Sequence, residues 1–244
     1  MMVVLLGIVT CWVLASPALA ADGDIDPAFS HDGFQATSQL QEDLGVADVS
    51  PHVAMQGSRV LVADSKTVVR LTASGQRDQS FAHRGILRAT SRQQVVFDIA
   101  VDGAGRILLL LGQGDPVPSR YVVARFRRDG RRDHTFGRGR GWVSPPFMPA
   151  DLGGAALGVA ADGSTFIAGG ANQVAKLSPA GDLASDFGQE GLATIEGASS
   201  LRTLTIGRGG EVYVGGIPSV YRLTRDGGVD PEFAPPSASD LCCE

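Results

Sequence analysis

Cysteine is nearly absent from the sequence, and this absence excludes a fold stapled by disulfides. The 244 residues include three cysteines: Cys11 lies in an N-terminal apolar segment, and Cys242 and Cys243 are adjacent near the C-terminus. Secreted domains that depend on disulfides carry many cysteines at regular spacing. We therefore expect a fold held together by packing, with Cys242 and Cys243 in a flexible C-terminal tail over residues 234–244.

A long apolar run is also missing. The apolar stretch at residues 3–15 is shorter than the roughly 20 residues that a helix needs to cross a bilayer, so no transmembrane segment is expected. Pro17 and then Ala-Leu-Ala at residues 18–20 follow, which fits a secretory cleavage site. We predict that residues 1–20 are a signal peptide cleaved after Ala20 and that the mature chain is secreted or periplasmic.

No catalytic or cofactor motif stands out. The sequence has no G-x-S-x-G and no H-E-x-x-H, and its glycine-rich pieces precede strand-like runs instead of the helices that hold phosphates. His31, His83 and His134 lie in separate loops, which favours solvated histidines over metal ligands. The sequence therefore predicts no catalytic residues, no metal and no cofactor.

What the sequence does contain is a segment that occurs five times. Its glycines, Gly23, Gly75, Gly130, Gly181 and Gly227, are each followed six residues later by Phe29, Phe81, Phe136, Phe187 or Phe233. Three residues after the glycine stands Asp26, Asp78, Asp133 or Asp230, whereas the fourth copy has Ala184. By subtraction, successive glycines are 52, 55, 51 and 46 residues apart, a spacing typical of one supersecondary unit per repeat.

Each repeat contains short apolar runs that are typical of strands. In the second repeat these are residues 95–101, 107–111 and 121–126, and a fourth run, residues 141–147, follows the repeated segment. The runs are β-branched or leucine-rich, are bounded by Gly and Asp, and are too short for helices. About four strands per repeat is the arithmetic of a β-propeller blade.

The two ends of the repeat array complement each other. The last repeated segment ends at Phe233 with no strand after it, whereas residues 33–38 form a strand-like run with no blade before it. We predict an all-β fold, a β-propeller over residues 21–233, most simply four blades of four antiparallel strands closed by the N-terminal strand. Such closure covers a sheet edge that would otherwise pair with another chain.

The repeated segment has a structural interpretation. Its glycine permits a positive φ in a turn, its Asp would cap a single helical turn at about 1 kcal/mol, and its Phe would plug between blades. The pattern h-[RK]-[LF]-x-x-x-G-x-x-D-x-x-F, clearest at residues 125–141 and 222–233, resembles the delta-60 repeat family. The resemblance implies a bacterial, often exported, propeller-like protein, and it transfers no catalytic residues.

One segment has a charge opposite to that of the chain. Residues 120–141 contain eight arginines against Asp129 and Asp133, in a protein with a net charge of −5. We predict a polyanion contact through the arginines that flank its turn: Arg125, Arg127, Arg128, Arg131, Arg132, Arg138 and Arg140. The alternative is a solvated rim whose arginines pair with neighbouring acids. For an exported chain the partner would be a protein, a glycan or lipopolysaccharide, and nucleic acid is unlikely.

Two functions remain open at this point. The first is an exported, non-catalytic propeller that acts as a binding or scaffold module. The second is a lyase or hydrolase of the kind that some propellers host, with a site at the mouth of the central channel. Fold alone does not choose between them, so the arrangement of polar residues must.

Overall fold

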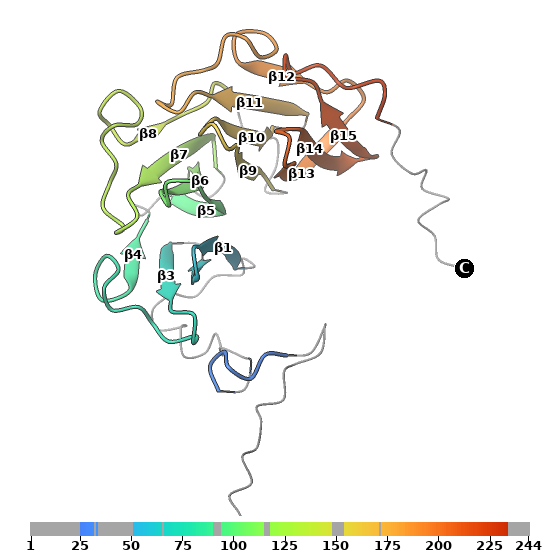
Figure 1. Cartoon of the computed structure of the whole chain (residues 1–244). Coiled ribbons are helices and arrows are strands. Elements are labelled where there is room, and N and C mark those ends of the chain that lie inside the picture. The colour runs from blue at the N-terminus through green and yellow to red at the C-terminus, as the bar shows by residue number, and fades with distance from the viewer. Residues whose placement is uncertain are drawn as a thin grey trace, which may run out of the picture.

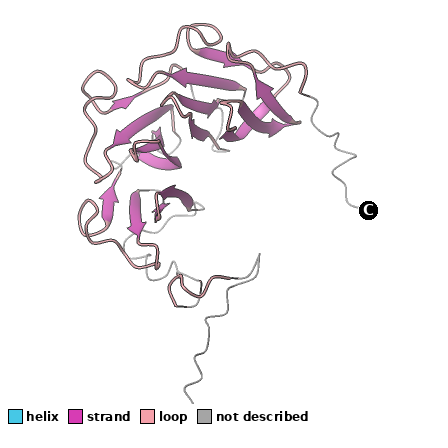
Figure 2. Ribbon diagram, viewed as in Figure 1, coloured by secondary structure: helices cyan, strands magenta, loops and turns pink. Residues whose placement is uncertain are grey.

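The computed structural model describes residues 25–31, 33, 51–64, 66–89, 94–114, 118–147, 154–170 and 172–233. In these ranges every regular element is a β-strand, and Figure 2 shows strands joined by loops and turns. The same ranges contain no helix long and apolar enough to cross a membrane. The predicted all-β fold is confirmed. The predicted signal peptide, residues 1–20, and the predicted tail, residues 234–244, lie outside the described residues.

The strands form four antiparallel sheets in chain order. Sheet 1 contains β1 (His52–Gln56), β2 (Arg59–Ala63), β3 (Thr67–Leu71) and β4 (Ile86–Arg88). Sheet 2 contains β5 (Gln94–Val101), β6 (Ile107–Gln113), β7 (Arg120–Phe126) and β8 (Trp142–Val143). Sheet 3 contains β9 (Ala156–Val159), β10 (Thr165–Gly169), β11 (Gln173–Leu177) and β12 (Leu192–Thr194). Sheet 4 contains β13 (Ser199–Ile206), β14 (Val212–Ile217) and β15 (Val220–Leu223).

The sheets stand side by side along an arc, with the core between them. Figure 1 shows sheets 1 and 4 at the two ends of this arc, and the first strands of neighbouring sheets, β1, β5, β9 and β13, contact each other on its inner side. Separate apolar clusters fill the spaces between sheets 1 and 2, sheets 2 and 3, and sheets 3 and 4. Both faces of an inner sheet are therefore covered, which explains the uninterrupted apolar runs of β6 and β7.

The predicted closure of the ring lies mostly outside the described residues. Sheet 4 has three described strands, and of residues 33–38, the predicted fourth strand, only Gly33 is described. The first repeated segment packs on sheet 1, where the Ser30 amide donates to the Ser74 carbonyl at 3.0 Å. Closure by an N-terminal strand thus stays a prediction.

A constant set of contacts joins each sheet to the next, which we call the junction. The phenylalanine of one repeated segment packs against the turn glycine of the following sheet, and a backbone amide beside it donates to that turn. These backbone hydrogen bonds run from Ala82 N to Asp129 O (2.9 Å), from Gly137 N to Ala180 O (2.8 Å) and from Gly188 N to Asp226 O (2.6 Å). Phe81, Phe136 and Phe187 are fully buried, so the prediction that they plug between blades is confirmed.

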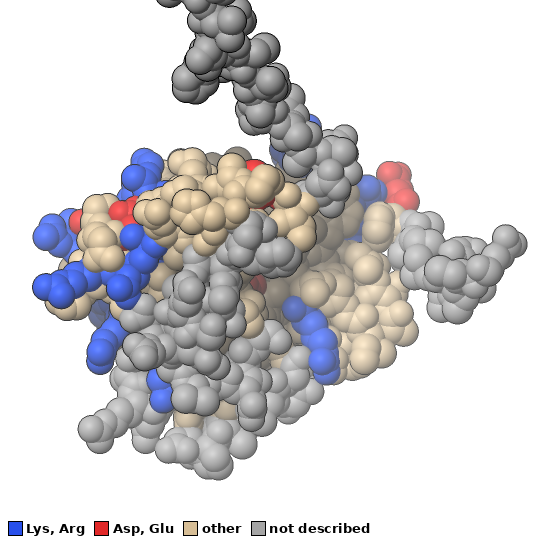
Figure 3. Space-filling view, turned by 90° about the horizontal axis from the view of Figure 1, so that it is seen from below, with Lys and Arg blue, Asp and Glu red and all other residues tan. Residues whose placement is uncertain are grey.

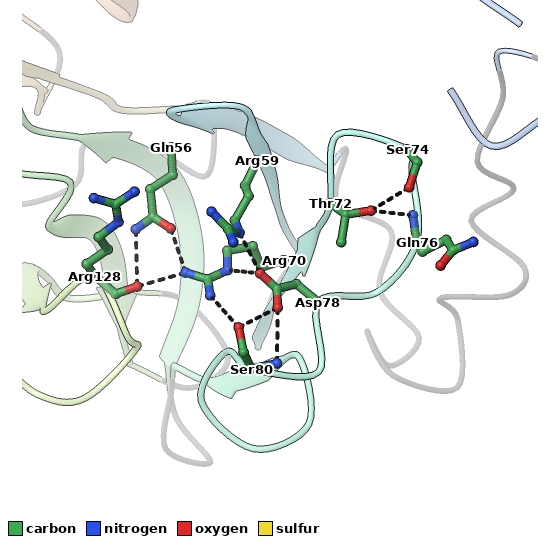
Figure 4. A network of polar contacts seen from close by, with 9 residues as sticks. All are labelled: Gln56, Arg59, Arg70, Thr72, Ser74, Gln76, Asp78, Ser80 and Arg128. Atoms are coloured by element: carbon green, nitrogen blue, oxygen red, sulfur yellow. Dashed lines mark hydrogen bonds and ion pairs between the residues drawn. The ribbon is translucent and has the colours of Figure 1, made fainter. Parts of the chain in front are cut away.

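Arginines of the third strands complete the first two junctions. Arg70 Nη1 donates to the Arg128 carbonyl of sheet 2 at 2.9 Å, and Figure 4 shows that Gln56 Oε1 accepts from the same nitrogen. Arg125 Nη1 donates to the Pro179 carbonyl of sheet 3 at 2.6 Å. The basic residues before the second and third repeated segments, Arg70 and Arg125, are therefore links between sheets.

The repeated Asp makes the same contacts in the second and third repeated segments, and these contacts differ from the predicted cap of a helical turn. Asp78 Oδ1 accepts hydrogen bonds from the amide and hydroxyl of Ser80, and Asp133 Oδ1 accepts the same pair from Thr135. These residues lie in turns, since the segment is too short to form a helix. The second carboxylate oxygen binds the strand arginine: Arg125 Nε lies 2.8 Å from Asp133 Oδ2, with both side chains buried. The Asp therefore joins a turn to a buried ion pair.

The environment of Asp78 lowers its pKa. Burial opposes ionisation, but hydrogen bonds from Ser80 and from the guanidinium groups of Arg59 and Arg70 outweigh it, and the pKa falls to about 2 from its ordinary value of 3.8. Asp133 is shifted in the same direction, because hydrogen bonds from Thr135 and the charge of Arg125 outweigh its burial. Both carboxylates stabilise the fold in their ionised form.

This shift predicts an acid-sensitive fold. Because the pKa of Asp78 in the folded chain lies below its ordinary value, its contribution is complete above about pH 4 and is lost as the pH falls through about 2. We expect the free energy of unfolding, measured by urea titration, to fall more steeply over this range in the wild type than in Asp78→Asn. Asp129→Asn, which removes an exposed carboxylate, controls for net charge. Equal slopes in wild type and Asp78→Asn would contradict this account.

Candidate functional site

The structure separates the seven candidate arginines into three environments. Arg125 is 2% exposed and pairs with Asp133, so its inclusion in a solvent-facing patch is wrong. Strand alternation places Arg125 and Phe126 on opposite faces of sheet 2. The face that carries Arg125 packs against sheet 3 instead of facing water. Burial lowers the pKa of Arg125, although its guanidinium remains charged at neutral pH.

Five of the candidates lie exposed around the outer turns of sheet 2. We call them the arginine rim: Arg127, Arg128, Arg131, Arg138 and Arg140. Figure 3 shows basic side chains gathered at one side of the molecule. Arg131 lies 3.8 Å from Asp129, and Arg138 lies 3.0 Å from Asp182, in pairs whose side chains are at least 49% exposed. Such exposed pairs contribute little energy, so an acidic ligand can replace them.

Arg132 lies apart from the rim, half-buried at the side of a groove. Its guanidinium lies 4.4 Å from the ring centre of Phe126, and its stem packs against Gly141. Burial lowers the pKa of this side chain, and no carboxylate of the described residues forms an ion pair with it. Arg132 is therefore a desolvated cation that can receive an anion.

The groove runs along the face of sheet 2 that is turned toward sheet 1 and has a volume of about 250 Å³. Val122 and Ala124 of β7, which are 2% and 0% exposed, close its inner end, and Arg120, two residues before Val122, lies on the same face. Pairing brings the other side chains beside them: Trp142 lies opposite Ala124, Gln113 opposite Arg120, and Gln94 opposite Gln113. The groove thus combines two guanidinium groups, two amides and an indole.

Sequence reasoning missed this groove. The sequence places Arg120 in the basic segment, but the predicted polyanion-binding residues include neither Arg120 nor Gln113 nor Trp142. The signal was present in the alternation of β7, because Arg120, Val122 and Ala124 are two residues apart. The partners on β6 and β8 became visible only with the register of the sheet.

The inner side of the arc carries one close pair of titratable groups. His52 Nδ1 of β1 lies 3.7 Å from Asp98 Oδ1 of β5. The Asp98 carboxylate also accepts hydrogen bonds from the amides of Ile99 and Leu157, each at 2.7 Å. Burial raises the pKa of Asp98, against the opposing effect of those hydrogen bonds and of His52. Asp98 therefore contacts the first strands of three sheets.

No metal site is found in the described part of the chain. Within it, no group of three or more His, Cys, Asp or Glu side chains could hold a metal ion. His134, one of the loop histidines, shares a hydrogen bond with the Gly139 carbonyl through Nδ1 at 2.8 Å. A larger cavity, about 660 Å³, lies by sheets 3 and 4 and carries Glu190 and Glu196 without Lys or Arg. That lining suits an acidic ligand poorly.

Sheets that stand side by side around an axis, each in antiparallel order from its inner strand outward, define a β-propeller fold. No protein-family model matches this chain, and no curated protein matches it. Similarity appears among solved structures. A Bacteroides caccae protein of unknown function is 12% identical, with a TM-score of 0.50, over 73% of this chain and 58% of its own.

Two other similar structures belong to named proteins. The WD40 domain of Pan2 from Neurospora crassa has a TM-score of 0.49 at 11% identity, over 74% of this chain and 48% of its own. A gluconolactonase from Xanthomonas campestris has a TM-score of 0.47 at 17% identity, over 72% and 59%. The chain spans about half to three fifths of the length of these structures. At such low identities the similarity concerns the fold alone.

Proposed function

We propose that this protein is an exported, non-catalytic β-propeller that acts as a binding or scaffold module and contacts an acidic partner through the arginine rim. One observation carries the proposal: five exposed arginines surround the outer turns of a single sheet in a chain whose net charge is −5. Guanidinium groups bind carboxylates, sulfates and phosphates with two parallel hydrogen bonds. Their surroundings are open to solvent, which suits an extended partner.

The export, the family and the closed ring belong to the same proposal. The Ala-Leu-Ala sequence at residues 18–20 supports a signal peptide, and the five repeated segments support membership of the delta-60 repeat family. Closure of four blades by residues 33–38 is supported by the first repeated segment, which contacts sheet 1 through Ser30 as the later segments contact their following sheets.

A second candidate function is a lyase or hydrolase with a site at the inner side of the arc. The contact between His52 and Asp98 favours it, because a histidine beside a carboxylate is a common acid–base arrangement. Both oxygens of Asp98, however, already accept backbone amides: Oδ1 accepts from Ile99 of the same strand, and Oδ2 accepts from Leu157, which joins sheets 2 and 3. This engagement supports a structural role for Asp98 and leaves the binding function as the better supported one.

The binding function predicts retention on a polyanion. The wild type should bind immobilised heparin at low salt and elute as salt screens the guanidinium charges. The variant with Arg127→Ser, Arg128→Ser and Arg131→Ser should elute at much lower salt, since three exposed charges are removed from the rim. The melting temperature should stay within a few degrees.

A matched control removes three arginines elsewhere. Arg202, Arg208 and Arg225 are exposed on sheet 4, and their replacement by Ser gives the same net charge as the rim variant. We expect this control to elute close to the wild type. A wild type that flows through heparin at low salt, or a control that loses as much retention as the rim variant, would rule out the arginine rim.

A further inference from the structure

The groove on sheet 2 differs in chemistry from the arginine rim, because it combines two guanidinium groups with two amides and an indole. We propose that it binds the carboxylate-bearing ring of an acidic oligosaccharide, a uronate. This inference deepens the proposed function and rests on it in one respect: the rim attracts a polyanion, and the groove recognises one of its sugars.

The walls of the groove fit a sugar ring. Trp142 lines one side of the groove, and Val122 and Ala124, which are 2% and 0% exposed, close its inner end. Arg140 covers a face of the indole, with its guanidinium 4.8 Å from the ring centre, and so holds Trp142 in place. The apolar C–H face of a pyranose packs on an aromatic ring such as this indole, whereas its hydroxyl groups need polar partners.

Polar side chains also line the groove. Gln113 Oε1 accepts a hydrogen bond from Arg120 Nε at 3.0 Å, which orients both side chains. Primary amides both donate and accept, so Gln113 and Gln94 match the hydroxyl groups of a sugar. This combination of amides and an indole distinguishes the groove from a simple phosphate or sulfate site.

Arg132 would bind the carboxylate of the ligand. Its stem is fixed between Phe126 and Gly141, so its guanidinium is preorganised instead of being free to move in solvent. It is also desolvated, and no ion pair with a carboxylate of the described residues neutralises it. A carboxylate on the ligand would supply the missing charge with a bidentate geometry. Arg120, which also lines the groove, would bind a second acidic sugar or a hydroxyl.

Trp142 provides a direct readout. The sequence has two tryptophans, Trp12 in the predicted signal peptide and Trp142 in the groove. In the mature chain, or in uncleaved protein with Trp12→Phe, all tryptophan fluorescence therefore comes from Trp142. Titration with trigalacturonate should shift this emission saturably, and maltotriose, a neutral trisaccharide, should not. Arg120→Gln and Arg132→Gln should each weaken trigalacturonate binding about tenfold. Arg131→Gln, which changes the rim, should leave the emission shift intact.

The outcomes separate this inference from the proposed function. Retention on heparin without any saturable effect of trigalacturonate would overturn the groove and leave the rim. A saturable effect without retention would support the groove and overturn the rim. Equal shifts with trigalacturonate and maltotriose, or with inorganic sulfate, would overturn uronate recognition. If Arg132→Gln fails to fold, the exposed Arg120→Gln decides, and unchanged affinity in that variant would overturn the inference.

Discussion

Replacing Asp133 by Ala is expected to lower the free energy of unfolding by about 3–5 kcal/mol, the usual range when one member of a buried ion pair is removed. The side chains of Arg125 and Asp133 are 3% and 4% exposed, so the variant would bury the Arg125 guanidinium without its counter-charge. It would also remove the acceptor of the Thr135 amide and hydroxyl. This loss is several times the 1 kcal/mol expected for a cap alone.

Urea unfolding of Asp133→Ala and Asp230→Ala tests this account. Asp230 and Arg222 form the equivalent pair on sheet 4 at 2.7 Å, but there the side chains are 20% and 27% exposed. Water can therefore replace the lost partner of Arg222, and Asp230→Ala should be clearly milder. Equal losses in the two variants would mean that burial of the pair does not determine its contribution.

The second large effect is expected for Phe136→Ala, which should destabilise the chain by about 3–5 kcal/mol, the range for a large aromatic side chain removed from a core. Phe136 is fully buried between sheets 2 and 3. A Cβ atom on Gly181 would come within 2.7 Å of its ring, and the φ of +92° at Gly181 disfavours any other residue. The junction cannot refill the space easily, because glycine offers no side chain to move into it.

Phe233→Ala is the matched control for this prediction. Phe233 has the same place in its repeat, but it is only half-buried at the end of the described arc, where its ring contacts Tyr213. Thermal unfolding should show a much smaller loss for Phe233→Ala than for Phe136→Ala. Comparable losses would contradict the account of phenylalanine as a plug between adjoining sheets.

The repeats made the sheets predictable, because each repeat contains the same strand-forming runs and the same turn residues. The runs at residues 107–111 and 121–126 appear within β6 and β7, and the run that begins at Gly141 contains β8. The burial of the Arg125 side chain could not be predicted in the same way. Alternation along β7 gave its face of the sheet, but only the position of sheet 3 shows that this face is buried. The groove likewise depends on strand register, which brings Gln113 and Trp142 beside β7.

The junctions join only adjoining sheets, so the repeats behave as links coupled to their nearest neighbours. Gain or loss of one whole repeat would add or remove a junction, and in the proposed closed ring it would also change how the two ends meet. The third link is the loosest, because Ala184 replaces the Asp and Lys176 reaches an exposed carboxylate, Asp186, at 3.3 Å. Fluctuations that separate sheets should therefore begin at sheet 4. Sheet 2, which carries the arginine rim and the groove, is held on both sides by junctions that contain a buried ion pair.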